Sequence, residues 1–384
     1  MLRVLLDATA VPPDRRGVGR YVDSLVPALV RTGVELRVAC RPSDTAHYGE
    51  LSRAEPVPVS RAAERPPSRL VWEQAGFPSV VRRIAPDLLH SPHYTHPLRS
   101  RVPLVVTLHD ATFFTDPGVH TRVKGPFFRT ATRLALRRAA CCVVPSQATA
   151  DELVRAARAD ASRLQVAHLG VDPAVFAPPS ATSVREVRAR LGIRDDQGYV
   201  AFLGTLEPRK NVPALVRGWV AAARGRANPP ALVLAGGSGW DDGLDAAVAE
   251  VPPQLTLLRP GYLPVELLGG LLGGAELVAY PSLGEGFGLP VLEAMSCGAA
   301  VLTTRRLALP EIGGDAVAYT EPDPASIAAA LGGLLDDPHR RGELAAAGMA
   351  RAAGFTWDAC ATAHVKAYEK AYKQAHERAR ASRR

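Results

Sequence analysis

The sequence has 384 residues, of which 47% are hydrophobic and 22% charged, which is typical of a soluble globular protein with room for two domains. No apolar run is long enough to span a bilayer, and residues 1–7 are too short and too soon acidic for a signal peptide. The net charge of +8 is uneven, because residues 1–180 carry +8, residues 181–365 carry −5 and residues 366–384 carry +5.

Short apolar runs alternate with helical patterns along the chain, which indicates parallel sheets covered on both faces. In the first half, strands are predicted at residues 3–7, 35–39, 88–90, 104–108, 141–145 and 163–167, and helices at 21–31, 127–139 and 148–156. After a Pro-rich break near residues 171–183, strands are predicted at 199–203, 232–235, 255–257, 277–280 and 300–303, and helices at 212–223, 265–270, 290–296 and 324–335. A charged helical segment ends the chain. We therefore predict two doubly wound α/β domains.

A glycine motif follows the first predicted strand. Gly17 and Gly19 lie between this strand and a helix of apolar period, where bare backbone can approach a phosphate at a helix N-terminus. The third glycine of the dinucleotide fingerprint is missing, because Val22 stands in its place. The motif does not support an NAD site, and a tight strand-to-helix turn is the alternative interpretation.

His109 follows the predicted strand at residues 104–108, at the end where α/β sheets bind ligands. An imidazole there can hydrogen-bond a sugar hydroxyl or support charge in a transition state. A histidine satisfied by its local neighbours is the alternative. His90, His93 and His96 raise the possibility of a metal site, but they lie in loop-like surroundings with no nearby carboxylate, so no metal site is predicted.

Two adjacent cations, Arg209 and Lys210, follow the predicted strand at residues 199–203 and the glycine after it. Arginine supplies a planar fork of donors and lysine a point charge, which together suit a diphosphate leaving group. A solvated basic turn is the alternative interpretation.

The segment after the predicted strand at residues 277–280 is the most informative one. Alternate glycines leave the loop as bare backbone, and a proline fits the first position of the next helix. Amides at the start of that helix, those of Phe287, Gly288 and Leu289, then point toward an anion. Glu285 lies in the loop and Glu293 in the first helical turn, so two carboxylates can accept hydrogen bonds from hydroxyls on either side of a diphosphate.

Together these segments resemble the retaining glycosyltransferases of family 4, which have the GT-B fold. The matching elements occur in the family's order and cover nearly the whole chain, at residues 17–21, 109–110, 144–146, 170–172, 208–211, 281–293, 309–311 and 355–357. The Glu-x7-Glu element with its Phe-Gly-Leu-Pro core is the specific part. The chain has Gly-Val-Gly where the wider family commonly has Gly-Gly. Together with its His-Asp and Leu-Pro-Glu elements, this makes the chain similar to the bacterial mannosyltransferase-like branch.

The resemblance implies two Rossmann-like doubly wound domains facing across a deep interdomain cleft. Residues 1–178 would form the acceptor-side domain and residues 184–356 the nucleotide-sugar donor domain. A C-terminal helix at about 357–384 would pack back on the first domain.

The resemblance also implies roles for single residues. Glu285 would bind hydroxyls of the donor sugar, and Glu293 the ribose. Arg209 and Lys210 would neutralise the diphosphate, and His109 would contact the sugar near its reacting carbon. The rest of the donor site would be Gly17, Gly19, Gly204, Phe287, Gly288 and Leu289, with Tyr262 and Leu263 beside the base.

The implied activity is retaining transfer of a hexose, with mannose from GDP-mannose as the first choice, to a glycan, a lipid-linked sugar or a small molecule. A UDP-sugar-dependent transferase and a nucleotide-sugar epimerase on the same fold are the alternatives. No cofactor is expected. No Asp-x-Asp triplet occurs in the chain, and Arg209 with Lys210 can replace a divalent ion, so metal independence is predicted.

Other partners and the location are also expectations. The five cysteines show neither metal-ligand nor disulfide spacing, which indicates a reducing, cytoplasmic compartment. The basic segment at residues 122–138 carries aromatics and is interpreted either as a contact with an anionic membrane, such as the inner face of the plasma membrane, or as an ordinary amphipathic core helix. Nucleic-acid binding is not predicted, because no recognition motif occurs and the second half is acidic. The full set of site residues also argues against an inactive scaffold.

Overall fold

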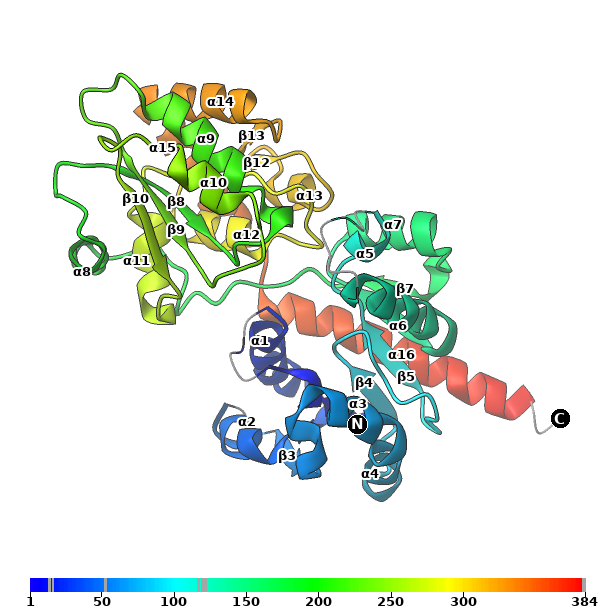
Figure 1. The fold of residues 1–384 in the computed structure, drawn as a ribbon. Coiled ribbons are helices and arrows are strands. Elements are labelled where there is room, and N and C mark those ends of the chain that lie inside the picture. Colours follow the sequence, from blue (N-terminus) through cyan, green and yellow to red (C-terminus); the bar gives the residue numbers. More distant parts are fainter. Residues whose placement is uncertain (13–14, 16, 52–53, 116–117, 119–122, 382–384) are drawn as a thin grey trace. The chain divides into compact units, whose positions relative to one another are not determined.

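The computed structural model describes residues 1–12, 15, 17–51, 54–115, 118 and 123–381, and in it the chain forms two compact units (Figure 1). Unit 1 comprises Met1–Gly170 and Thr356–Arg384, and unit 2 comprises Val171–Phe355. Residues 171–178 pack on unit 2, where Ser296 Oγ donates a hydrogen bond of 2.6 Å to the Phe176 carbonyl. A cleft between the units stays a prediction.

The sheet of unit 1 has seven parallel strands in the order β3-β2-β1-β4-β5-β6-β7. They are β1 (Arg3–Asp7), β2 (Glu35–Cys40), β3 (Glu55–Pro58), β4 (Leu88–Ser91), β5 (Leu104–Thr107), β6 (Cys141–Val144) and β7 (Leu164–Val166). The six predicted strands are present, with ends shifted by no more than one residue. The sequence analysis missed β3 because Pro56 and Pro58 interrupt it, and proline is tolerated only at a sheet edge, where β3 lies.

The helices of unit 1 are α1 (Val18–Arg31), α2 (Thr45–Leu51), α3 (Pro66–Ala75), α4 (Phe77–Ile84), α5 (Thr112–Thr115), α6 (Lys124–Arg138), α7 (Gln147–Ala157) and α16 (Trp357–Ala381). The long helix α16, at the red end of the colour scale in Figure 1, packs against α1 and the sheet. Its buried residues recur at helical spacing, so one face of the helix belongs to the core of unit 1: Cys360, Ala361, His364, Ala367, Tyr368 and Ala371.

The sheet of unit 2 has six parallel strands in the order β10-β9-β8-β11-β12-β13. They are β8 (Tyr199–Leu203), β9 (Ala231–Ala235), β10 (Leu257–Gly261), β11 (Leu277–Tyr280), β12 (Val301–Thr304) and β13 (Ala318–Thr320). The two edge strands were the ones predicted poorly. β10 begins two residues later than expected and contains Pro260, and the short strand β13 was not predicted.

The helices of unit 2 are α8 (Ala181–Leu191), α9 (Val212–Ala223), α10 (Leu244–Ala249), α11 (Leu268–Gly273), α12 (Leu289–Ser296), α13 (Leu309–Gly313), α14 (Pro324–Asp336) and α15 (Pro338–Ala352). Helix α9 packs against α10 and α14, whereas α12 packs against α11, α13 and α15. Among the described residues, no helix is both long and apolar enough to cross a membrane.

The strand order places one ligand-binding crevice in each sheet. In unit 2 the chain runs outward from β8 through β9 to β10, and then returns to the other side of β8 to form β11. Because crossover connections are right-handed, the helices that follow β8 and β11 lie on opposite faces of the sheet. This opens a crevice at the carboxyl ends of these two strands. Unit 1 has the same reversal between β1 and β4. The predicted pair of doubly wound α/β domains is confirmed.

The loops at the carboxyl ends of β8, β9 and β10 are joined by backbone hydrogen bonds. The Gly204 amide donates to the Ala235 carbonyl (3.0 Å), and the Gly236 amide to the Gly261 carbonyl (2.8 Å). Gly236 has φ of 140°, and a Cβ atom there would lie 2.0 Å from the Gly204 carbonyl oxygen. Only glycine fits this position, which brings the loop after β9 close to the loop that precedes Arg209 and Lys210.

We predict that Gly236→Ala destabilises the protein by about 1–3 kcal/mol or more, because backbone atoms, and not a flexible side chain, must move to admit the methyl group. Urea unfolding measures the change. Gly333→Ala is the matched control, since Gly333 is an exposed helical residue with open space around its Cβ position. The control should be neutral or more stable by about 0.5–1 kcal/mol. Equal stabilities for the two variants would contradict the packing argument.

Candidate active site

Two loops in the crevice of unit 2 carry the charged residues that the sequence analysis singled out. The first follows β8 and forms a short 3-10 helix, η6 (Pro208–Lys210), and the second runs from β11 to α12. The Leu283 amide donates to the Arg209 carbonyl at 2.9 Å. The Asn211 side chain, on a residue with left-handed backbone, donates to the carbonyls of Pro281 (3.2 Å) and Pro322 (2.7 Å). A main-chain hydrogen bond and the Asn211 side chain therefore hold the two loops together.

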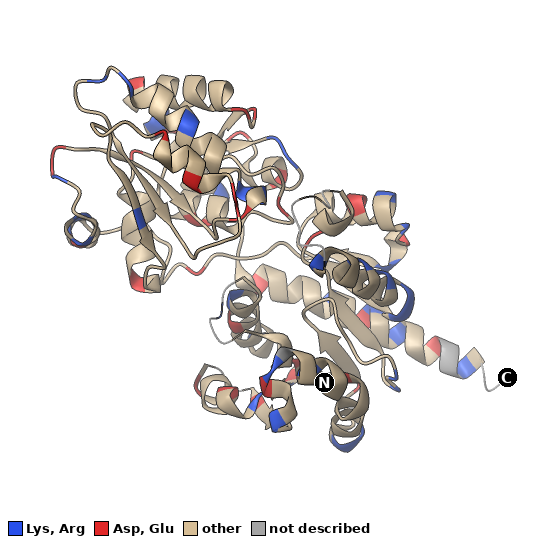
Figure 2. Ribbon diagram, viewed as in Figure 1, with Lys and Arg blue, Asp and Glu red and all other residues tan. Residues whose placement is uncertain are grey.

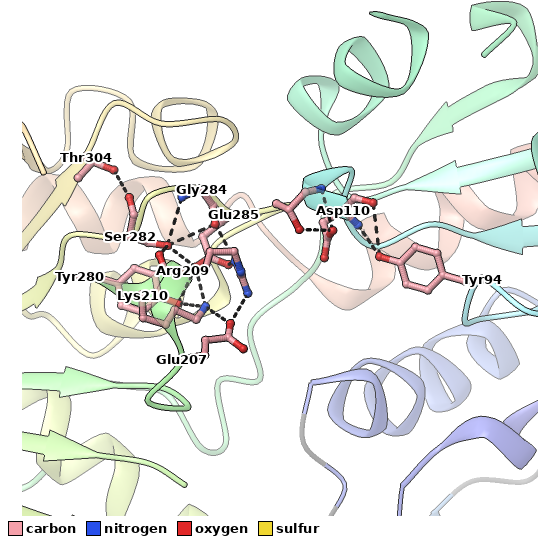
Figure 3. A network of polar contacts seen from close by, with 11 residues as sticks. Tyr94, Asp110, Glu207, Arg209, Lys210, Tyr280, Ser282, Gly284, Glu285 and Thr304 are labelled. Carbon is pink, nitrogen blue, oxygen red and sulfur yellow. Dashed lines mark hydrogen bonds and ion pairs between the residues drawn. The ribbon is translucent and has the colours of Figure 1, made fainter. Parts of the chain in front are cut away.

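The carboxylate of Glu285 is contacted from several sides by the polar side chains of these two loops and of β11 (Figure 3). Lys210 Nζ donates to Oε1 at 2.6 Å, the Tyr280 hydroxyl at 2.9 Å and Ser282 Oγ at 2.8 Å. The guanidinium of Arg209 donates to the other oxygen, Oε2. Both oxygens of a buried carboxylate are thus satisfied, as burial of a charge requires.

The charges of the cluster determine which of its groups are ionised. Burial alone would raise the pKa of Glu285, but the positive charges and hydrogen bonds of Arg209 and Lys210 outweigh it and lower the pKa to about 2. Burial, followed by repulsion from Arg209, lowers the pKa of Lys210. Arg209 is also paired with Glu207 at 2.7 Å. Two cations and two carboxylates therefore share one buried site, and an anionic ligand can compete with the carboxylates for the cations.

The start of α12 is the place at which the sequence analysis predicted backbone donors for an anion. Gly288 is the N-cap, with φ of 103°, and Leu289 is the first helical residue. The side chain of Phe287 is buried beside Phe355, at 6.1 Å between ring centroids, so its amide and not its ring is suited to a ligand. Glu293 is the fifth residue of the helix, not part of its first turn as expected, and is buried. The helix begins at Leu289, one residue before the predicted start at residue 290.

Three further residues from the prediction lie at the carboxyl ends of β8 and β10. Gly204 follows β8 directly, and Tyr262 and Leu263 follow β10. The Tyr262 side chain is 62% exposed, whereas Leu263 is buried. An exposed aromatic ring at a strand end is a suitable surface on which a nucleobase can stack.

Gly17 and Gly19 lie at the start of α1 in unit 1. Gly17 is the N-cap of the helix, and Gly19 is a buried residue of its first turn. A Cβ atom on Gly19 would lie 2.9 Å from Arg15 Cβ and 3.3 Å from Val11 Cγ1. The absence of a side chain at residue 19 therefore lets the helix start pack closely on the loop after β1.

His109 follows β5 in unit 1, and its hydrogen bonds define its tautomer. Nε2 lies 2.7 Å from the Pro92 carbonyl oxygen, which can only accept, so Nε2 carries a proton. Burial lowers the pKa of the ring, which is therefore neutral, and Nδ1 has a free lone pair for accepting a hydrogen bond. The next residue, Asp110, caps α5 through Thr112 and exchanges hydrogen bonds with Tyr94 (Figure 3). The structure thus presents His109 as an acceptor for a hydroxyl group.

Of the predicted residues, Arg209, Lys210 and Glu285 are in direct contact with one another. Gly17, Gly19 and His109 belong to unit 1, and the other predicted residues belong to unit 2. The sequence analysis gave no role to Tyr280, Ser282 and Glu207, which complete the cluster around Glu285. The sequence signal that could have identified Tyr280 is its place at the end of a buried strand, five residues before Glu285.

Of the three histidines that raised a metal possibility, His90 has a hydroxyl partner on each ring nitrogen. His90 contacts the Thr107 hydroxyl through Nε2 at 2.9 Å and the Tyr368 hydroxyl through Nδ1 at 2.8 Å. In the part of the chain that the structure describes, no group of three or more His, Cys, Asp or Glu side chains is placed to hold a metal ion.

Comparison with known proteins gives consistent matches over both units. Residues 15–175 match the model of the family "Glycosyltransferase Family 4", and residues 183–351 match "Glycosyl transferases group 1". O-antigen chain mannosyltransferase B of Escherichia coli is 30% identical over 334 residues, covering 85% of this chain and 84% of that protein. A D-inositol 3-phosphate glycosyltransferase of Kineococcus radiotolerans is 30% identical over 399 residues, covering 92% and 90%. The epimerase alternative finds no support in these matches.

A solved structure shares the fold. The crystal structure of Anabaena HepE in complex with UDP and glucose superimposes with a TM-score of 0.73, over 96% of this chain and 100% of that one, at 18% sequence identity. At this identity the likeness concerns the fold, and it agrees with the two doubly wound units expected for the GT-B class.

We predict that Glu285→Gln destabilises unit 2 by about 3–5 kcal/mol at pH 7, since the buried Lys210 and the partly buried Arg209 would lose the carboxylate that they share. Glu285 has a lowered folded-state pKa, so its contribution is complete above the unfolded value of 4.5 and is lost as the pH falls through about 2. The difference between variant and wild type should therefore be as large at pH 5 as at pH 7 in urea unfolding.

The control is Glu250→Gln, which removes one partner of the exposed pair with Arg217 and should change stability little. A Glu285→Gln variant as stable as this control would contradict the electrostatic account of the cluster.

Proposed function

The chain belongs to glycosyltransferase family 4, and from this premise we propose that it is a retaining hexosyltransferase that uses a nucleoside-diphosphate sugar. GDP-mannose is our first choice of donor, since a mannosyltransferase is among the relatives at 30% identity. A UDP-sugar is the second choice, favoured by the UDP and glucose bound to the structural neighbour HepE. The proposed acceptor is a glycan, a lipid-linked sugar or a small molecule.

The observation that carries this proposal is the buried cluster of Glu285, Arg209 and Lys210 in the crevice of unit 2. When the bond between sugar and diphosphate breaks, negative charge grows on the departing phosphate. Two preorganised cations in a buried site stabilise that charge more strongly than water does. As the diphosphate takes over the cations, Glu285 stays ionised and can accept hydrogen bonds from hydroxyls of the donor sugar.

The remaining donor contacts follow from the elements around the cluster. Amides at the start of α12 face an anion in the way helix N-termini generally do. Glu293, on the same helix, is proposed to bind the ribose, and Tyr262 with Leu263 to border the base. Gly17 and Gly19 are proposed to face the diphosphate.

The proposed reaction gives retention of configuration. The acceptor hydroxyl attacks the oxocarbenium-like sugar from the face that the diphosphate leaves, and the departing phosphate takes the proton. His109, a neutral ring with an accepting Nδ1, would hold a sugar hydroxyl near the reacting carbon. We propose that Arg209 and Lys210 do the work that a divalent ion does in other transferases, so no metal is required.

We predict hydrolysis or transfer with one nucleotide sugar, GDP-mannose first, when GDP- and UDP-sugars are screened by mass spectrometry of the products. The rate should be undiminished in EDTA, because the two cations are part of the protein. A strict requirement for Mg²⁺ or Mn²⁺ would contradict the proposed role of the cations, and epimerised donor without transfer would contradict the proposed reaction.

We further propose a cytoplasmic protein that contacts the inner face of the plasma membrane through α6. Arg122 of the predicted basic segment lies outside the described residues, and residues 124–138 of the segment form the whole of α6. Phe128 stacks on Phe113 in the core, but Phe127 is 41% exposed. Figure 2 marks the basic residues along α6, and the side chains exposed to solvent are those of Lys124, Arg133, Arg137 and Arg138. A basic face with an exposed aromatic suits an anionic surface.

We predict sedimentation with vesicles that contain phosphatidylglycerol, and not with pure phosphatidylcholine, at physiological salt. The variant Lys124→Glu/Arg137→Glu should lose this binding. Arg185→Glu/Arg190→Glu makes the same change of charge on exposed residues of α8 in unit 2 and should bind as the wild type does. No binding of the wild-type protein would rule out the membrane contact.

A further inference from the structure

We propose that the C-terminal helix α16 holds His109 in its working orientation, with Tyr21 and His364 as positioning residues for glycosyl transfer. This inference rests on the proposed function, in which His109 meets a sugar hydroxyl. All the residues concerned belong to unit 1.

Tyr21, on α1, connects His109 to α16. Its ring lies edge-on to the His109 ring, with 4.9 Å between centroids and 85° between planes. Its hydroxyl lies 3.0 Å from Thr107 Oγ1 on β5 and 2.7 Å from His364 Nε2 on α16. Tyr21 is buried, so the packing around its ring restricts the side chain to the one position in which its hydroxyl meets both partners.

The direction of every hydrogen bond in this network can be assigned from one fixed end. His364 Nδ1 lies 2.8 Å from the Cys360 carbonyl, which can only accept, so Nδ1 carries the proton. Burial lowers the pKa of His364 to about 4, so the ring is neutral and its Nε2 is an acceptor. The Tyr21 hydroxyl must therefore donate to His364, and its oxygen is left to accept from Thr107.

The remaining bonds then follow in sequence. Thr107 has one hydroxyl proton, which goes to Tyr21, so Thr107 Oγ1 must accept from His90 Nε2 at 2.9 Å. Burial lowers the pKa of His90, and a neutral ring that donates through Nε2 accepts through Nδ1. The Tyr368 hydroxyl of α16 donates to that nitrogen at 2.8 Å. One directed chain thus leaves α16 at Tyr368, passes through the sheet and α1, and returns to α16 at His364.

This chain has no second arrangement that keeps all its bonds, because the Cys360 carbonyl fixes its polarity. A shift of α16 by one residue, or loss of His364, leaves a buried hydroxyl or ring nitrogen without a partner, which costs about 1–3 kcal/mol. The position of the Tyr21 ring is therefore coupled to α16 and not only to its own helix.

The Tyr21 ring is one of the groups that hold the His109 ring in its orientation. Its Nε2 is held by the Pro92 carbonyl, and the Tyr94 ring contacts it at 5.9 Å between centroids. Tyr21 provides the nearest aromatic contact of the ring among those in the described part of the chain. If Tyr21 moves, rotation about the Pro92 hydrogen bond becomes possible, and Nδ1 no longer points in one direction. A displacement of about 1 Å in such a group can lower a rate by up to about a hundredfold.

The chain offers a matched control for this coupling. Arg31 on α1 and Asp358 on α16 form an exposed ion pair at 2.6 Å, which also joins these two helices but lies outside the network. Arg31→Ala therefore weakens the docking of α16 without touching Tyr21, His364 or His109.

The test compares His364→Ala, His364→Gln and Arg31→Ala in the full chain, with the donor found in the screen. We expect kcat to fall about tenfold or more in His364→Ala with little change in KM for the donor, since the proposed contacts to its base, its ribose and the two phosphate-binding cations are in unit 2. His364→Gln should recover part of the rate, because its amide oxygen can accept from the Tyr21 hydroxyl. Arg31→Ala should keep the wild-type kcat.

A second measurement does not depend on turnover. In ¹⁵N spectra of the histidine side chains, the wild type and Arg31→Ala should show a single tautomer of His109 with the proton on Nε2, whereas His364→Ala should show tautomer averaging. Tyr21→Phe, which keeps the ring and removes the hydroxyl, should behave in the same way if His364→Ala does not fold.

The outcomes separate the two proposals. If the wild-type protein transfers no sugar from any donor, the proposed function fails. If it does transfer sugar and His364→Ala and Tyr21→Phe match Arg31→Ala in kcat and in the His109 spectrum, the positioning role is overturned.

Discussion

The burial of one carboxylate, that of Glu285, determines how unit 2 is built around its crevice. Removing a charge from water costs several kcal/mol, and only nearby cations and hydrogen-bond donors offset that cost. Arg209, Lys210, Tyr280 and Ser282 supply them. Tyr280 is the last residue of β11, and the other three lie in the segments that follow β8 and β11. Because both cations contact the Glu285 carboxylate, Arg209 and Lys210 are held close together in spite of their like charges. The cations and hydrogen-bond donors that stabilise the buried carboxylate of Glu285 are also suited to stabilise the negative charge of a diphosphate.

The candidate site residues of the two units are held by polar contacts of different kinds. Unit 2 uses ions, and its geometry depends on backbone contacts such as the approach of Gly236 to the Gly204 carbonyl. The network behind His109 in unit 1 uses neutral groups, with hydrogen bonds whose direction is fixed by the Cys360 carbonyl. This difference agrees with the proposed division of labour, in which unit 2 handles a charged diphosphate and unit 1 presents an acceptor atom to a sugar hydroxyl.

Much of this could be predicted from the sequence, for reasons that particular residues make clear. Central strands such as β8 and β11 were located correctly because they are continuous apolar runs, whereas β3, β10 and β13 are edge strands that contain proline or are very short. Arg209, Lys210 and Glu285 stood out because they lie in loops that follow buried strands, at the end of the sheet where ligands bind. The role of His364 could not be predicted in the same way. It contacts Tyr21, far away in the sequence, and nothing in the local pattern distinguishes a polar core residue from a positioning one.

The central claim is that Arg209 and Lys210 form the diphosphate site. Calorimetric titration of GDP and UDP into the wild type, Arg209→Gln and, as a control of equal charge change, Arg217→Gln tests it most directly. Arg217 is paired with Glu250 on the surface of α9, away from the cluster. The account predicts that one nucleotide binds to the wild type and to Arg217→Gln alike, and that Arg209→Gln loses about tenfold to a hundredfold in affinity, as expected for hydrogen bonds to charged groups. Equal affinity in all three proteins would contradict it.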